Sequence, residues 1–209
     1  MGMTWPDVWA LVHTERRLLA DDLAALDAAA WDVPSLCGGW SVHDVVAHLV
    51  DTAHMGRRGF VTSMARARGD FDLANAHGVA RHRHDDPART LDALRATVDL
   101  RRTPPAHRAT RLVEVFVHGE DVRRPLGLEG RYPRAGLYEA IAHQLRTRRP
   151  FGGGREIAAG LRLTDGTTSW GEGPEVAGRT IDLLLVATGR HVDPGLLAGP
   201  GASTLVARL

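Results

Sequence analysis

Apolar residues recur at intervals of three and four through the first two thirds of the chain, the spacing of helices that bury one face. Ser41 and Asp44 form a capping-box variant, so the second helix begins at Ser41; it continues beyond Met55, toward Arg68. The polar segment 69–87 has few core residues and predicts a loop. We expect helices over 5–26, 41–68, 87–101, 106–124 and 134–148.

The pattern changes after the glycine-rich segment 150–154, which is the best candidate for a domain boundary. Residues 157–164 alternate like a strand, Asp165-Gly166 is a hairpin turn, and 180–188 form an apolar helix. We therefore predict a mainly α protein of the α+β class. A helical bundle occupies 1–150, and a small α+β domain occupies 155–209.

Composition describes an ordinary globular protein and excludes several function classes. Of the 209 residues, 44% are hydrophobic and 24% charged, and the net charge is +1, so nothing favours nucleic acid or an anionic membrane as a partner. Cys37 is the only cysteine, which excludes a disulfide framework and fits a reducing, cytoplasmic location. No apolar run approaches the roughly 20 residues of a membrane span.

Glu114 and His118 stand four residues apart in an apolar helix, so their side chains share one face and can bind one divalent ion. The alternative is a surface ion pair, which their apolar neighbours disfavour. His48 is either a third ligand or a buried histidine that bonds a carbonyl. Together the three predict a His₂Glu site with one open position, as in catalytic zinc centres. Zinc is expected first, and nickel or another first-row metal second.

Other polar residues have two interpretations each. Asp44 and Asp51 could orient the imidazole of His48, but a helix cap for Asp44 and a solvated acid for Asp51 are favoured. The cluster around His77, His82 and His84 predicts a solvated, mobile loop, from which Arg81 or Arg83 could contact a substrate. Cys37 is expected to serve packing, and the segment Gly152-Gly153-Gly154 is expected to be a linker.

Three segments, in order, resemble the mycothiol-dependent maleylpyruvate isomerase family, within the DinB-like group of metal-binding helical bundles. The resemblance implies a divalent metal on His48, Glu114 and His118, and mycothiol as thiol cosubstrate. The segments are Pro34-Ser35-Leu36-Cys37-Gly38-Gly39-Trp40 leading into 44–49, then 114–124, and finally 160–163 with Trp170 and Gly173-Pro174-Glu175-Val176.

The resemblance further implies that a metal-activated mycothiol thiolate attacks a small electrophilic substrate, giving S-transfer or cis–trans isomerisation. No motif marks residues that contact the thiol or the substrate, and nothing in the sequence indicates recognition of a dicarboxylate. The competing hypothesis is a non-catalytic, metal-stabilised protein that binds a ligand or partner. A fourth protein ligand, such as His54 or Asp121, would favour that hypothesis.

Overall fold

The computed structural model describes residues 2–209, and the chain forms two compact units. The first spans Thr4–Arg131, and the second spans Tyr132–Leu209 together with residues 2 and 3. Among the described helices, none is long and apolar enough to cross a membrane.

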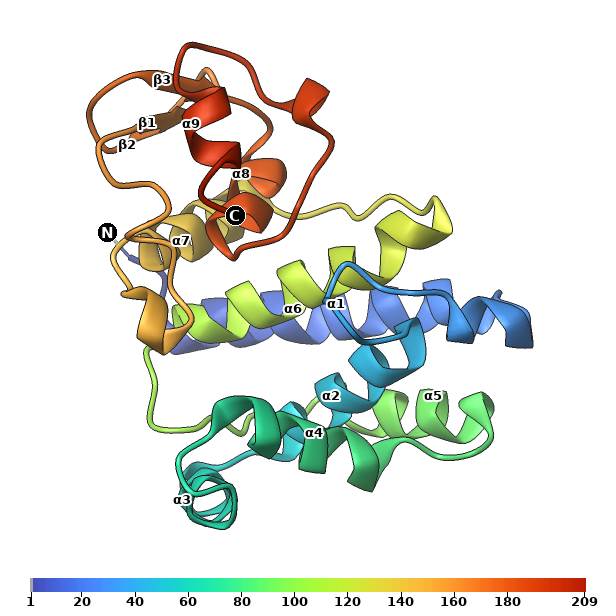
Figure 1. Ribbon diagram of the computed structural model, residues 1–209. Helices are drawn as coiled ribbons and strands as arrows, with labels where there is room; N and C mark the ends of the chain where they lie inside the picture. Colours follow the sequence, from blue (N-terminus) through green and yellow to red (C-terminus); the bar gives the residue numbers. More distant parts are fainter. Residues whose placement is uncertain (1) are drawn as a thin grey trace. The chain divides into compact units, whose positions relative to one another are not determined.

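The first unit is a bundle of helices around one apolar core (Figure 1). In it α1 lies beside α6, and α2 packs against α4, α5 and α6. Leu19 and Leu23 from α1 meet Val45 and Val46 from α2 and Leu94 from α5 in the core. The helices are α1 (Trp5–Ala24), α2 (Val42–His54), α3 (Arg57–Arg66), α4 (Phe71–His82), α5 (Pro87–Ala96) and α6 (Ala109–Arg123), with short 3₁₀ turns at Ala28–Asp32 and Arg124–Leu126.

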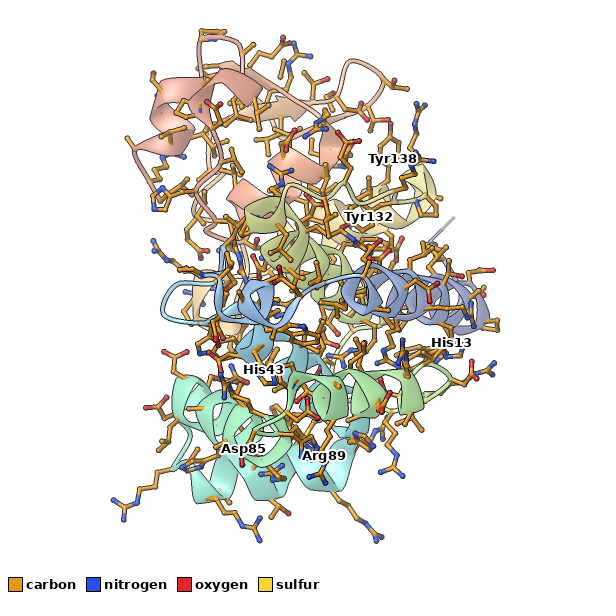
Figure 2. The ribbon with its side chains drawn as sticks, turned by 90° about the vertical axis from the view of Figure 1, so that its right-hand side faces the viewer. His13, His43, Asp85, Arg89, Tyr132 and Tyr138 are labelled. Atoms are coloured by element: carbon orange, nitrogen blue, oxygen red, sulfur yellow. The ribbon has the colours of Figure 1, made fainter. Side chains whose placement is uncertain are left out.

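Asp44 completes the predicted capping box of α2. The Ser41 hydroxyl accepts a hydrogen bond from the Asp44 backbone N–H at 3.2 Å, and Asp44 Oδ2 accepts one from the Ser41 N–H at 3.0 Å. Inside the unit, Nε2 of His43, a residue labelled in Figure 2, lies 2.8 Å from Oγ1 of Thr90 and so joins α2 to α5. Burial lowers the pKa of His43, so its ring is neutral at pH 7.

Two expectations for this unit are wrong. The segment 69–87 is mostly helical, because α4 occupies Phe71–His82. Its Asp70 caps the helix by accepting a hydrogen bond from the Leu73 N–H at 3.0 Å. The long second helix is instead two helices, since Met55 adopts an extended backbone conformation and α3 begins after Gly56.

The second unit contains a small three-stranded sheet in the order β2-β1-β3, and its α7 packs on α8. Strand β1 pairs antiparallel with β2, Leu163 opposite Trp170, and parallel with β3, Leu163 opposite Val176. The elements are α7 (Arg134–Gln144), a 3₁₀ turn at Arg149–Phe151, β1 (Arg162–Thr164), β2 (Ser169–Trp170), β3 (Glu175–Ala177), α8 (Thr180–Ala187), a 3₁₀ turn at Pro194–Leu196 and α9 (Ala202–Val206).

The predicted hairpin turn is present between β1 and β2, although β1 is shorter than the predicted strand. One carboxylate oxygen of Asp165 accepts from the Thr167 and Thr168 N–H groups at 2.9 and 2.8 Å. The other oxygen accepts from the hydroxyls of Tyr138, labelled in Figure 2, and Thr180 at 2.7 and 2.8 Å. Burial acts to raise the pKa of Asp165, but these hydrogen bonds outweigh it and lower the pKa.

Along the chain, the first compact unit ends at Arg131 and the second continues from Tyr132, whereas the sequence places the change of domain at 150–155. The glycine-rich segment is tightly packed within the second unit. A Cβ on Gly153 would overlap the Thr147 carbonyl oxygen, and one on Gly154 would overlap the Ala187 carbonyl oxygen. These glycines therefore serve close backbone approach rather than a free linker. The domain limits 1–150 and 155–209 stay a prediction.

Candidate functional site

The structure brings His48 and His118 together inside the first unit. Their rings meet edge to face, with centroids 4.8 Å apart and planes at 73°. His48 lies on α2 and also contacts the Trp40 ring, with centroids 5.0 Å apart. His118 lies on α6, which packs against α2. The apolar faces that join these helices therefore also set the two imidazoles side by side.

The ring of His118 is oriented by Asp121, which is fully buried one turn further along α6. Nδ1 of His118 lies 2.8 Å from Oδ2 of Asp121. Because a carboxylate only accepts hydrogen bonds, Nδ1 carries the proton and donates it. In the neutral ring the lone pair is then on Nε2, the nitrogen that is available to bind a metal ion.

Glu114 is largely shielded from solvent rather than part of a solvated surface pair: its side chain is 10% exposed. Its Oε2 lies 2.8 Å from Nη2 of Arg111. Its Oε1 is buried and has no hydrogen-bond partner among the described residues. A buried carboxylate oxygen without a donor costs free energy, so this atom is suited to a further ligand.

His48, Glu114 and Arg111 line one cavity of about 220 Å³ in the first unit. Phe60 and Met64 from α3 and Phe71 from the start of α4 contribute apolar walls. The sequence did not identify this part of the site, because the segment that carries Phe71 was expected to be a loop. The other lining residues are Asp51, Thr52, Met55, Ser63, Ala74, Asn75 and Pro104.

The donor set fits a divalent cation in its chemistry, since it offers two imidazoles and a carboxylate oxygen that lacks a hydrogen-bond partner. Within residues 2–209, however, no three histidine, cysteine, aspartate or glutamate side chains are grouped as a metal site. The metal site at His48, Glu114 and His118 therefore stays a prediction.

A second cavity of about 290 Å³ lies next to the first and shares Asp51, Met55 and Ser63 with it. Asp51 is 5% exposed, so its interpretation as a solvated acid is wrong. Its Oδ1 lies 2.8 Å from Nη1 of Arg81 and 3.4 Å from Nε2 of His82. Burial raises the pKa of Asp51, while Arg81 and His82 counteract that shift.

The histidine-rich segment that includes His82 is also largely helical rather than a loop, because α4 extends to His82. The His82 ring stacks on His54, with centroids 5.6 Å apart and planes at 6°. Arg81 lines the second cavity, whereas Arg83 pairs with Asp44, Nε to Oδ1, at 2.9 Å.

Cys37 is half-buried and packs against the core, in keeping with its predicted packing role.

Comparison with known proteins identifies the family. A family model described as the mycothiol maleylpyruvate isomerase N-terminal domain matches residues 12–145. The fold is similar to a crystal structure of the mycothiol-dependent maleylpyruvate isomerase, with a TM-score of 0.66 and 17% identity over 96% of this chain and 94% of that chain. A mutant of that isomerase, with one histidine replaced by alanine, matches with a TM-score of 0.63, 17% identity and the same coverage. A search of curated proteins gave no significant match.

The chain belongs to the mycothiol maleylpyruvate isomerase N-terminal domain family, because the family model covers more than half of its length. The family predicted from the sequence is thereby confirmed. The predicted fold class, a mainly α DinB-like bundle followed by a small α+β part, is confirmed by the helical first unit, the small sheet and the likeness to the isomerase structures.

Proposed function

We propose that this protein is an enzyme that uses mycothiol to isomerise a small electrophilic substrate or to transfer the thiol to it. The observation that carries the proposal is the cavity lined by His48, Glu114 and Arg111 in a member of this family. Its size suits a small molecule. Its walls combine apolar side chains with a few polar groups, as in sites that orient a reactive ligand.

His48, Glu114 and His118 would hold a divalent cation, with zinc expected first. The support is the adjacent pair of imidazoles, the hydrogen bond that occupies Nδ1 of His118, and the buried Oε1 of Glu114 without a donor. Such a cation, when bound, would supply the positive charge that lowers the pKa of a thiol that it coordinates.

The side chains of this chain position the reactants in the proposal. Asp121 holds the His118 ring in one tautomer, and Trp40 packs against the His48 ring. Phe60, Met64 and Phe71 give the cavity apolar walls, which would strengthen electrostatic interactions inside it once a bound ligand displaces water. The protein needs no cysteine nucleophile, because the thiol comes from the cosubstrate.

Two outcomes are open to the thiol chemistry. Addition of the sulfur to a cis-alkene conjugated with a carbonyl, rotation about the new single bond and loss of the thiol give isomerisation, with mycothiol regenerated. Displacement of a leaving group gives a thioether and makes the protein an S-transferase.

In the competing hypothesis of a non-catalytic binding protein, a fourth protein ligand closes the metal site. Asp121, one candidate, instead accepts from His118, and His54 lines the second cavity.

Product analysis tests the proposal. The protein is incubated with mycothiol and either maleylpyruvate or an alkyl halide, and products are identified by NMR. Isomerisation predicts trans product with no net loss of thiol, and transfer predicts a stoichiometric mycothiol thioether. If neither product forms faster than with mycothiol alone, the proposal is wrong.

A further inference from the structure

Arg111 presents an unusual combination of burial and unused hydrogen-bond donors. Its side chain is 7% exposed and lines the cavity that also contains His48 and Glu114. Nη2 contacts Glu114, but Nε and Nη1 are buried and have no hydrogen-bond partner among the described residues. Buried guanidinium N–H groups without acceptors are costly, so these nitrogens form an incomplete site for an acceptor.

The local charge balance indicates that the missing acceptor is an anion. Arg16 from α1 is also buried, and its Nη1 donates to the carbonyls of Thr97 and Leu100, both at 3.0 Å. Burial lowers the pKa of Arg16, Glu114 raises it and Arg111 lowers it, so the three charges interact. The other buried carboxylate of this cavity, Asp51, pairs with Arg81. Arg16 and Arg111 thus share the one carboxylate of Glu114, which leaves an excess of positive charge in a low-dielectric interior.

We propose that Arg111 determines specificity by binding a carboxylate of the electrophilic substrate through Nη1, the unused nitrogen at the end of its guanidinium group. This inference rests on the proposed function for its identification of the ligand as the substrate. A guanidinium donates strong, charge-assisted hydrogen bonds to a carboxylate. Mycothiol itself has no carboxylate, so the acid group comes from the other reactant. The cavity of about 220 Å³ is smaller than the roughly 300–1,000 Å³ typical of drug-sized ligands and suits a small organic acid.

The competing role for Arg111 is purely structural: it would only position Glu114 through the contact at 2.8 Å. The two roles predict different results for charged and neutral substrates. A residue that positions Glu114 affects both substrates equally. A residue that binds the substrate carboxylate affects only the charged one, and it acts mainly on KM.

The kinetic test uses iodoacetate and iodoacetamide, which share a leaving group and differ in charge. Rates of mycothiol thioether formation are divided by the rates with mycothiol alone. We expect wild-type kcat/KM to favour iodoacetate by about ten-fold, the value of one charge-assisted hydrogen bond. Arg111→Gln reduces this preference to near one by raising KM for iodoacetate, and Arg111→Lys retains part of it. Arg95→Gln, an exposed arginine on α5, is the matched control and keeps the wild-type preference.

The second test needs no turnover. Isothermal calorimetry of the wild type with unreactive succinate and with succinamide should show binding of the acid alone, and Arg111→Gln should lose it. Equal binding of both compounds, no binding of succinate, or an unchanged substrate preference in Arg111→Gln would overturn the inference. A wild type that binds succinate but forms no thioether or isomer contradicts the proposed function and leaves the anion site of Arg111 standing.

Discussion

Asp121 and His118 form a partly buried hydrogen bond on α6, with Oδ2 and Nδ1 2.8 Å apart. The pair has the arrangement that orients histidine ligands in metal sites, in which a carboxylate accepts from one ring nitrogen and the other nitrogen faces the ligand. It also explains why Asp121 is fully buried, since its charge is held by a specific donor.

Replacement of Asp121 by asparagine should weaken metal binding, because an amide no longer fixes the tautomer of His118. We expect a loss of about ten- to a hundred-fold in zinc affinity, measured by competition with a chromogenic chelator. Asp92→Asn, which alters an exposed carboxylate on α5, is the control and should bind as the wild type does. Equal affinities for all three proteins would contradict an orienting role for Asp121.

The predicted ligands can be tested by elemental analysis of purified protein. His48→Ala, Glu114→Ala and His118→Ala should each reduce the bound metal from about one equivalent to a small fraction, because each removes one of three ligands. His13→Ala on α1, far from this set in the sequence, is the control and should retain the metal. Wild-type metal content in all three variants would refute the site.

A buried ion cluster joins α1 to α6 and should dominate the electrostatic part of stability. The guanidinium of Arg123 is 2% exposed and bonds both Glu15 and Asp22. Arg123→Met leaves the buried carboxylate of Glu15 without its partner and should cost about 3 kcal/mol at pH 8. Urea denaturation measures the cost. Arg17→Met, which removes an exposed arginine of α1, should cost almost nothing.

The cost of Arg123→Met should depend on pH. Burial raises the pKa of Glu15 from 4.5 to about 7 even though Arg123 counteracts the shift, so the pKa rises further in the variant. A carboxyl group with a raised pKa in the folded state holds its proton there at pH values where the unfolded chain has lost it. Its contribution to stability is full below pH 4.5 and declines as pH rises through the folded-state pKa. The destabilisation should therefore be smaller at pH 5 than at pH 8, and equal values would contradict the assignment.

Close packing of α4 against α2 depends on Gly78. A Cβ at this position would lie 2.5 Å from Oδ2 of Asp51, so Gly78→Ala must displace Asp51 from Arg81 and His82. We expect a loss of about 1–3 kcal/mol, measured by thermal or urea unfolding. Gly38→Ala is the matched control, since its Cβ would meet nothing within 4 Å. An unchanged stability in Gly78→Ala would show that α4 does not need this approach.

The helices with large buried residues were predictable from sequence, and the helix with small ones was not. Leu112, Val115 and Phe116 of α6 mark its buried face by their spacing. The buried residues of α4 are Ala74, Gly78 and Val79, too small to give a strong periodic signal. The capping residue Asp70 was the available indication of α4.

The site was predictable only in part, for a similar reason. Spacing on one helix indicates that Glu114 and His118 share a face, and the resemblance adds His48. The unused donors of Arg111 and the burial of Asp51 depend on which helices pack around them, which a single sequence does not specify. Tertiary contacts therefore decide the parts of the site that spacing could not reveal.

The most direct test of the thiol chemistry compares metal-loaded wild type with Glu114→Gln, using mycothiol and a panel that contains maleylpyruvate and generic alkylating electrophiles. Metal content is confirmed by elemental analysis before each assay. The proposal predicts that wild type accelerates at least one reaction well above the rate with mycothiol alone, and that Glu114→Gln loses most of this acceleration. Rates indistinguishable from mycothiol alone across the whole panel, with metal present in the wild type, would contradict it.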